Sequence, residues 1–266
     1  MNQVVVKENS QVPIKKFILC ILVLIALAAS FFAGTIVEGN NLKRAKIEGP
    51  GFKSEEEAME AFANAYANKD IEGMFACCSI ESNITNYDYY EYFDIVHAYY
   101  PTYRYSTGND AASYEIDKHI RMSTLTTTFY NMYLAPSLDE ASELLTGNSI
   151  GLDDEDAIDE LCEQLRLTDN IDRIKVDKVS SADKYIKDVD SMYDNFEKYY
   201  DVYGGEIKPM SAIIKIDGIK WIMFADTIEL DGRWYILCPG GMTGSHAGLS
   251  YLTGGMIRKS EFNDLN

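Results

Sequence analysis

The feature that most constrains this chain is an uncharged apolar run that extends from Phe17 to Val37. As a helix this run would be ~31 Å long, because each residue adds about 1.5 Å, and the hydrocarbon core of a bilayer is about 30 Å thick. Lys15 and Lys16 stand directly before it. The run therefore predicts a transmembrane anchor over residues 17–37.

A cleaved signal peptide is the alternative, since Ala26-Leu27-Ala28 offers a cleavage site of the small-x-small kind. The apolar run continues past that site through Phe31 and Phe32, which favours a retained anchor. Three bases lie on each flank, and the free amino terminus and the abutting lysine pair favour a cytoplasmic location for residues 1–16. We therefore expect a single-pass protein of the cell membrane with its main domain on the extracytoplasmic side.

Net charge excludes one class of partner. The chain has 24 basic and 42 acidic residues, of which six and two lie in residues 1–46. Residues 47–266 therefore carry 18 bases and 40 acids, a formal charge of −22. A domain this acidic repels nucleic-acid phosphates and anionic lipid headgroups. We expect no nucleic-acid partner, and we expect contact with the lipid bilayer through the N-terminal helix.

Helices dominate the first part of the main domain. Residues 38–53 are rich in glycine and asparagine and predict a polar stalk. Ser54 then opens a helix with Glu57 as its capping-box partner. The apolar residues of that helix recur at helical spacing: Ala58, Met59, Phe62, Ala65 and Tyr66. Further helices are expected at 71–80, from Met122 to Tyr133 (where threonines 124 and 126–128 also suit a strand), from Asp153 to Leu165, and at 184–203.

The last third changes to a period of two. A strand is expected at 171–179, and alternating apolar runs then flank Asp217-Gly218 and Asp231-Gly232, the pairs typical of type I′ hairpins. The fold class is therefore α+β: an N-terminal transmembrane helix, a helix-rich first part, and a C-terminal antiparallel β-meander packed on helices. The glycine-rich run 240–246 predicts a flexible exit loop, so we expect a domain over 54–240 and a tail over 241–266.

Two segments have a pattern that can be compared with a known family. The first runs from Gly51-Phe52-Lys53-Ser54 through Asp70, Glu72 and Gly73, and the second is Asp231-Gly232-Arg233-Trp234-Tyr235-Ile236-Leu237. They resemble the opening and the closing hairpin of bacterial nuclear-transport-factor-2-like domains of anchored proteins from Gram-positive bacteria. Together they cover a small share of the chain, and the middle, 84–209, would be a helical insertion. The resemblance implies a curved sheet packed on helices around a cone-shaped cavity, used for small-molecule binding, for protein contacts, or for isomerase or dehydratase chemistry.

Motifs for catalysis or for a bound metal are not found in the sequence. His97, His119 and His246 do not stand at catalytic or metal-ligand spacings, and we expect no metal and no cofactor. Four cysteines follow the anchor: Cys77, Cys78, Cys162 and Cys238. They are compatible with two disulfides, but each lies in an apolar stretch, which favours buried thiols.

Tyrosine is concentrated between Tyr87 and Tyr105, a stretch that holds eight of the 19 tyrosines. They pack between helices, or some of them face solvent and offer ring faces to a sugar or peptide. The candidate ligand-binding residues are Tyr99, Tyr103, Trp221 and Asp226. We expect a binding or interaction domain whose partner is an envelope protein, a small molecule or a glycan. The alternative is an isomerase- or dehydratase-like enzyme with an Asp226–tyrosine pair in a cone-shaped pocket.

Overall fold

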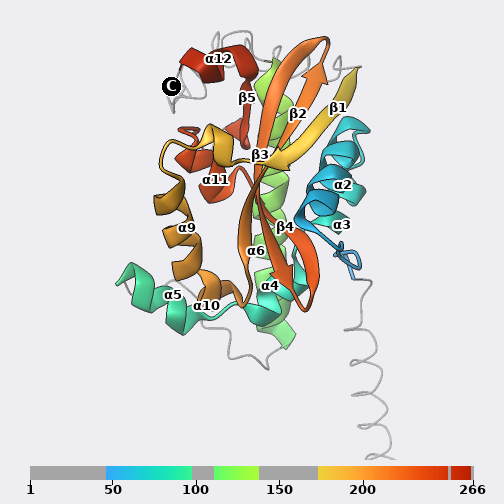
Figure 1. The fold of residues 1–266 in the computed structure, drawn as a ribbon. Coiled ribbons are helices and arrows are strands. Elements are labelled where there is room, and N and C mark those ends of the chain that lie inside the picture. The colour runs from blue at the N-terminus through green and yellow to red at the C-terminus, as the bar shows by residue number, and fades with distance from the viewer. Residues whose placement is uncertain (1–45, 98–110, 138–172, 251–252, 265–266) are drawn as a thin grey trace, which may run out of the picture. The chain divides into compact units, whose positions relative to one another are not determined.

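The structure of the protein is a computed structural model that describes residues 46–97, 111–137, 173–250 and 253–264 (Figure 1). The chain divides into two compact units, 1–46 and 47–266, and all described helices and strands belong to the second. Among the described helices, none combines the length and the hydrophobicity that a membrane span needs. The expected anchor, 17–37, lies outside the described residues, as does the helix expected from Asp153 to Leu165.

An antiparallel sheet with the order β1-β2-β3-β4 forms the centre of the domain (Figure 1). The strands are β1 (Ile174–Ser181), β2 (Ile207–Ile216), β3 (Ile219–Leu230), β4 (Arg233–Pro239) and β5 (Met256–Arg258). One edge of strand β3 pairs with two different strands. Residues Trp221 to Met223 pair with β5, and residues Ala225 to Leu230 pair with β4. The expected α+β class and C-terminal meander are confirmed.

Both predicted hairpin turns are present. Ile216 pairs with Ile219, and Leu230 pairs with Arg233, so each loop has two residues. Asp217 and Gly218 have φ of 49° and 87°, and Asp231 and Gly232 have φ of 53° and 73°. Positive φ at both loop positions defines a type I′ turn, whose twist matches that of the flanking strands.

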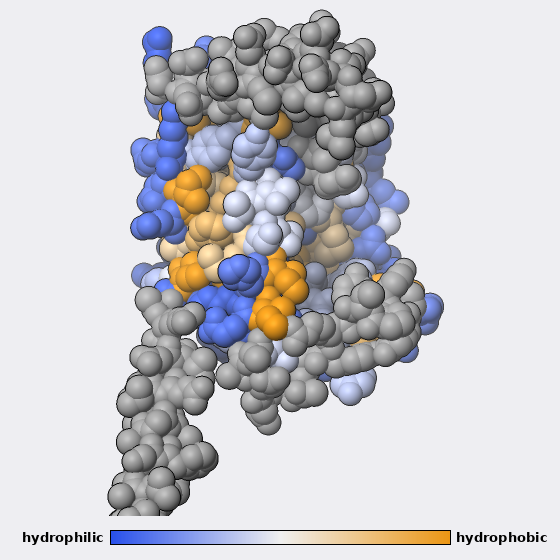
Figure 2. Space-filling view, turned by 180° about the vertical axis from the view of Figure 1, so that it is seen from behind, coloured by the Kyte–Doolittle hydropathy of each residue, from blue (hydrophilic) through white to orange (hydrophobic). Residues whose placement is uncertain are grey.

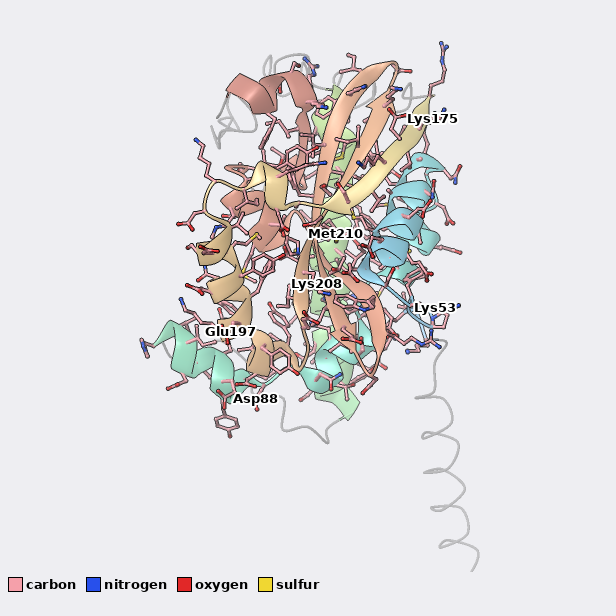
Figure 3. All side chains as sticks on the ribbon, in the orientation of Figure 1. Lys53, Asp88, Lys175, Glu197, Lys208 and Met210 are labelled. Atoms are coloured by element: carbon pink, nitrogen blue, oxygen red, sulfur yellow. The ribbon has the colours of Figure 1, made fainter. Side chains whose placement is uncertain are left out.

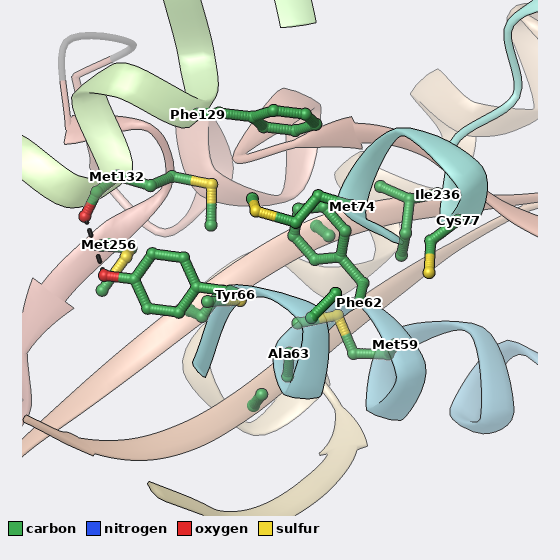
Figure 4. Packing of buried hydrophobic residues seen from close by; sticks show 14 of the residues in the cluster. Met59, Phe62, Ala63, Tyr66, Met74, Cys77, Phe129, Met132, Ile236 and Met256 are labelled. Atoms are coloured by element: carbon green, nitrogen blue, oxygen red, sulfur yellow. Dashed lines mark hydrogen bonds between the residues drawn. The ribbon is translucent and has the colours of Figure 1, made fainter. Parts of the chain in front are cut away.

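The first face of the sheet is covered by α2 (Glu55–Ala67), α3 (Ile71–Cys77) and α6 (Ala111–Leu134). Helix α2 begins as predicted: the Ser54 hydroxyl accepts a hydrogen bond from the Glu57 N–H at 3.2 Å. Its predicted apolar residues are all buried against the sheet. The Tyr66 hydroxyl donates to the Met132 carbonyl at 3.0 Å and so ties α2 to α6 (Figure 4). The helix expected near Met122–Tyr133 is confirmed, and the strand alternative is wrong.

The second face is covered by α9 (Val189–Lys198), α10 (Tyr200–Tyr203), α11 (Gly241–His246) and α12 (Lys259–Asp264). Ile222 and Phe224 of β3 point into this second core, while Met223 and Ala225 point into the first. That alternation is the period of two expected of a strand buried on both sides. The short helices α4 (Glu81–Asn86) and α5 (Tyr89–Val96) lie beside α10 at one end of the sheet (Figure 1).

Two expected boundaries differ from the structure. The flexible exit loop expected at 240–246 is helix α11, and the tail expected over 241–266 also contains β5 and α12. Glycine has a low helix propensity, so the sequence of α11 by itself favours a loop, and tertiary contacts must supply the stability. At the other end, the expected stalk over 38–53 extends too far, because Ile47 and Phe52 already pack on the first core.

Residues 47–52 are held by buried carboxylates. The Glu81 carboxylate accepts from the Ile47 and Glu48 N–H groups at 2.9 and 3.0 Å, and it pairs with the Lys118 ammonium at 2.6 Å. The Glu48 carboxylate accepts in return from the Ile80 and Ser82 N–H groups at 2.7 and 2.9 Å. Burial alone would raise the pKa of Glu81, but the hydrogen bonds from Lys118 and from the Ile47 and Glu48 N–H groups hold it below its usual value. The domain therefore begins at Ile47.

Candidate functional site

A pocket with a volume of about 770 Å³ lies between α6 and the chain that follows β4. Side chains of α6 form one wall: Ser123, Thr124, Thr127, Thr128 and Asn131. Figure 2 shows the molecule from behind, where weakly polar residues drawn in pale colours run down the middle of the surface. All five of these side chains are uncharged hydrogen-bonding groups.

The opposite wall is made mostly of main chain. It consists of residues 238–241, Gly244, Ser245, Leu249, Ser250 and Gly255. Because five of these residues are glycine or proline, the pocket is bounded there by backbone atoms and a few short side chains. Among the described residues that line the pocket, Cys238 is the one ionisable group. Burial raises the pKa of its thiol, so it is protonated at neutral pH.

The base of this wall is formed where β3 changes partner. The Phe224 carbonyl accepts from the Gly240 N–H at 2.8 Å, and the Phe224 N–H donates to the Gly255 carbonyl at 2.9 Å. Gly240 and Gly255 have φ of 75° and 82°, and a Cβ added at either would lie 3.0 Å or less from backbone atoms of the other. Only glycine at both positions lets β4 and β5 meet on the same edge of β3.

Asp226 holds α11 against the sheet from behind the pocket. One carboxylate oxygen accepts from the Met242 N–H at 2.8 Å, and the other accepts from the Thr243 N–H and hydroxyl at 2.9 and 2.6 Å. The side chain is 2% exposed and lies at a bulge between β3 and β4. Burial raises the pKa of this carboxyl to about 6, while the three hydrogen bonds oppose the shift. Asp226 thus acts as the N-terminal cap of a helix that begins only at Gly241, beyond the whole of β4.

The other sequence-predicted site residues do not gather around the pocket. Tyr99 and Tyr103 lie outside the described residues. Trp221 is 3% exposed in the first core, with the Arg258 guanidinium 5.4 Å from its ring centre. Trp234 pairs with Glu229, eight positions along β3 from Trp221, so the two indoles are roughly 26 Å apart along the strand. Trp234 lies instead under the ammonium of Lys208, which is labelled in Figure 3 and also pairs with Glu55 at 3.1 Å.

The described tyrosines of the Tyr87–Tyr105 stretch mostly pack together. The Tyr87 ring contacts those of Tyr89, Tyr92 and Tyr203 at centroid distances of 4.8, 5.9 and 5.3 Å. Burial raises the pKa of Tyr203 to about 12, and the negative charge of Asp226 adds to this effect. Tyr90 is 80% exposed, so it is one tyrosine of the stretch that does face solvent. Tyr203 is not among the residues that line the pocket.

The described cysteines are free thiols, and one described histidine, His246, joins two helices. Cys77, Cys78 and Cys238 are free thiols, as expected, and Cys162 lies outside the described residues. The His246 ring lies 3.1 Å from the Asn195 amide and so joins α11 to α9. In the part of the chain that is described, three or more metal-ligating side chains do not come together.

Sequence reasoning missed the threonines that line the pocket. Thr124, Thr127 and Thr128 belong to the run that also suited a strand, and their chemistry is visible only when α6 places them on one wall. The signal in the sequence is the run from Ser123 to Thr128 within a helix of 24 residues, since its four threonines and one serine have modest helix propensity. Their presence on a surface-exposed helix needs an explanation other than helix stability.

Fold and pocket together define a class: an α+β domain with an antiparallel meander, helices on both faces, and an uncharged hydrogen-bonding pocket beside α6. No family model matches the chain, and no curated protein matches it. Among solved structures, it is similar to the crystal structure of a cystatin-like protein from Ruminococcus gnavus ATCC 29149, with 14% sequence identity and a TM-score of 0.41. The match covers 82% of this chain and 44% of that one, so the chain spans less than half of that protein.

Proposed function

We propose that the chain is a membrane-anchored domain of a Gram-positive-type bacterium that binds a small polar ligand outside the cytoplasm without transforming it. The observation that carries this proposal is the pocket beside α6. Its volume of about 770 Å³ is in the range of small-molecule sites, and its described lining combines neutral hydrogen-bonding side chains with apolar surface. Catalysis by side chains generally needs a tuned acid, base or nucleophile next to the substrate, and among the described lining residues the one ionisable group is a protonated thiol.

The architecture and the location belong to the same proposal. The capped helix, the second helix and the closing hairpin support a nuclear-transport-factor-2-like plan. The apolar run 17–37 and the lysine pair before it support a single-pass anchor with the domain outside, where an envelope protein, a small molecule or a glycan would be encountered. Protease added to intact protoplasts should therefore digest the domain, and full protection would contradict this orientation.

The isomerase- or dehydratase-like alternative is less well supported. It needs the Asp226 carboxylate to face a substrate, but both oxygens of that carboxylate accept hydrogen bonds from the first turn of α11. Asp226 is also absent from the described pocket lining. A base that already accepts three protein hydrogen bonds would have to release the helix before it could accept a proton from a substrate. Binding is therefore the function that the geometry favours.

Gly244 offers a way to fill the pocket without disturbing the rest of the fold. A Cβ at this position would lie 3.8 Å from the Gly255 Cα and 4.0 Å from the Leu249 Cδ1, which are ordinary contacts with two other residues of the lining. Alanine is thus tolerated at position 244, and a leucine side chain would extend into the pocket. Thr126 is exposed on α6 and does not line the pocket, so Thr126→Leu adds the same bulk elsewhere.

Binding is tested on the full chain in detergent with a library of uncharged fluorinated fragments, by ¹⁹F line broadening. We expect a subset of fragments to broaden with the wild type, less with Gly244→Ala, and not with Gly244→Leu. Thr126→Leu should behave like the wild type. Melting temperatures of all four proteins show whether each variant is folded. The proposal is wrong if Gly244→Leu is folded and every fragment that binds the wild type binds it equally well.

A further inference from the structure

Three of the four hydroxyl groups that α6 contributes to the pocket, those of the threonines, direct their hydrogens at the helix itself. Thr124, Thr127 and Thr128 donate to the carbonyls four residues earlier, at 3.0, 3.1 and 3.0 Å. A carbonyl oxygen can only accept, so each threonine hydrogen is committed to its own helix. A hydroxyl has one hydrogen and two lone pairs. Toward the pocket these three side chains therefore present acceptors.

The opposite wall has used its backbone hydrogens as well. The Met242 and Thr243 N–H groups, which would otherwise point out of the start of α11, donate to Asp226. The Gly244 N–H donates to the Gly240 carbonyl, and the Gly255 N–H donates to the Thr253 hydroxyl at 3.2 Å. Free backbone N–H groups are what makes a helix start attractive to anions. Here the buried carboxylate of Asp226 already accepts those hydrogen bonds, as an anionic ligand otherwise would.

The charges around the pocket also disfavour an anionic ligand. The described lining contains neither a lysine nor an arginine, and residues 47–266 carry a formal charge of −22. An anionic ligand would lose its hydration in a pocket whose described lining has no cation, within a negative surrounding field. A ligand that brings its own donors would find acceptors in the threonine oxygens of the α6 wall. Asn131 and the serine hydroxyls of the lining supply donors for the acceptors of the ligand.

We propose that this pocket binds an uncharged polyhydroxylated molecule, a sugar or a polyol, and discriminates against its anionic form. This inference rests on the proposed binding function and names its ligand class. Residues three and four apart on a helix have Cβ atoms about 5–6 Å apart, so Thr124, Thr127 and Thr128 present a row of acceptors on the scale of a sugar ring. The threonine methyl groups and Leu249 provide apolar contacts for the C–H groups of such a ring.

Three sugars of nearly the same shape separate charge from shape: glucose is neutral, glucosamine is cationic and glucuronate is anionic. Binding to the full chain is measured by saturation-transfer NMR in a polyoxyethylene detergent, because glucoside and maltoside detergents would compete. We expect glucose and glucosamine to bind and glucuronate to bind about five-fold more weakly or worse. Equal or tighter binding of glucuronate overturns the inference.

The threonines have a matched control on the same helix. Thr126 is exposed and donates to the Met122 carbonyl at 2.8 Å in the same way, but it does not line the pocket. Valine has the shape of threonine without the oxygen. Losing one acceptor should weaken glucose binding about three- to ten-fold, so Thr124→Val and Thr127→Val should each do so, and Thr126→Val should not. Equal effects at all three positions overturn the inference.

Gly244→Leu separates failure of this inference from failure of the proposed function. If glucuronate binds best and Gly244→Leu abolishes that binding, the pocket is a ligand site and its proposed selectivity is wrong. If none of the three sugars binds while fluorinated fragments bind the wild type and not Gly244→Leu, the ligand class is wrong and the binding function stands. If glucose binds the wild type and Gly244→Leu equally, the sugar site lies elsewhere and the inference is wrong.

Discussion

At the scale of single residues, Asp226 shows which structural features can be predicted from the sequence and which cannot. Its position in an alternating run between two hairpin signals places it on a strand of the meander, and that placement is confirmed. What the sequence does not indicate is its structural role, because a bulge and the return of the chain at Gly240 make it the cap of α11. A capping residue is recognisable in a sequence when it directly precedes its helix, as Ser54 does. A cap that comes from another strand carries no such local signal.

Asp226 also predicts a pH dependence of stability. Its pKa is about 6 in the folded protein and 3.8 is the ordinary value, so between these values the folded state holds a proton that the unfolded state has lost. The carboxyl therefore stabilises the fold most below about pH 4, and this contribution declines as the pH rises through 6, by ~3 kcal/mol in total. Asp226→Asn does not titrate. The difference in unfolding free energy between wild type and variant, measured by urea denaturation with tryptophan fluorescence, should fall between pH 4 and 7, and a constant difference would contradict the assignment.

At the scale of elements, predictability follows from whether the stabilising contacts are local. The two Asp-Gly hairpins and helix α2 were predictable because turn residues, cap and apolar spacing all lie within the element. Helix α11 was not, because its glycine-rich sequence depends on Asp226 and on burial in a distant part of the domain. The pocket is formed by such non-local elements on one wall and by the threonines of α6 on the other, so its residues could not be chosen from spacing alone.

The hairpin at Asp231-Gly232 supplies a prediction for an element. Gly232 has φ of 73°, and a Cβ there would meet no atom within 4 Å, so a substitution acts through the backbone alone. Gly232→Val should reduce the unfolding free energy by about 1–2 kcal/mol, because a β-branched residue is strained at positive φ. Gly232→Asn should cost less than half of that, since asparagine tolerates the left-handed region. The measurement is urea denaturation, and equal stability of the two variants would show that the turn does not constrain this strand pair.

At the scale of the whole molecule, the order of elements could be predicted and the extent of the domain could not. A helix-rich first part followed by the β2–β3–β4 meander is expected from the change of hydrophobic period near residue 209, and the structure has that order, with helices α11 and α12 added after the meander. The limits are set by contacts between segments far apart in the chain. The Glu81 carboxylate accepts a hydrogen bond from the Glu48 N–H, and the Glu48 carboxylate accepts one from the Ile80 N–H, so these contacts join segments more than 30 positions apart. Strand β5, which follows the glycine-rich run, pairs with β3. Glycine and proline near residue 50 favoured a stalk because turn-forming residues have the same sequence pattern whether or not they pack on a core.

The hydrogen bonds that hold residues 47–52 against the rest of the domain lead to a prediction for the whole domain. Glu81 is 8% exposed and holds the Ile47 and Glu48 N–H groups, and its charge is balanced by Lys118. Lys118→Met leaves that carboxylate buried without its cation, which should cost ~3 kcal/mol and loosen the segment that ends with the Phe52–Trp234 bridge. Trypsin should then cut after Lys53 and release a fragment that begins at Ser54, seen by mass spectrometry.

The controls are the wild type and Lys198→Met, which removes an exposed lysine from α9. Both should resist cleavage after Lys53, because Phe52 exchanges two 3.0 Å backbone hydrogen bonds with Trp234. Rapid cutting after Lys53 in the wild type would mean that the domain begins at Ser54 and that the contacts of residues 47–52 do not hold in solution.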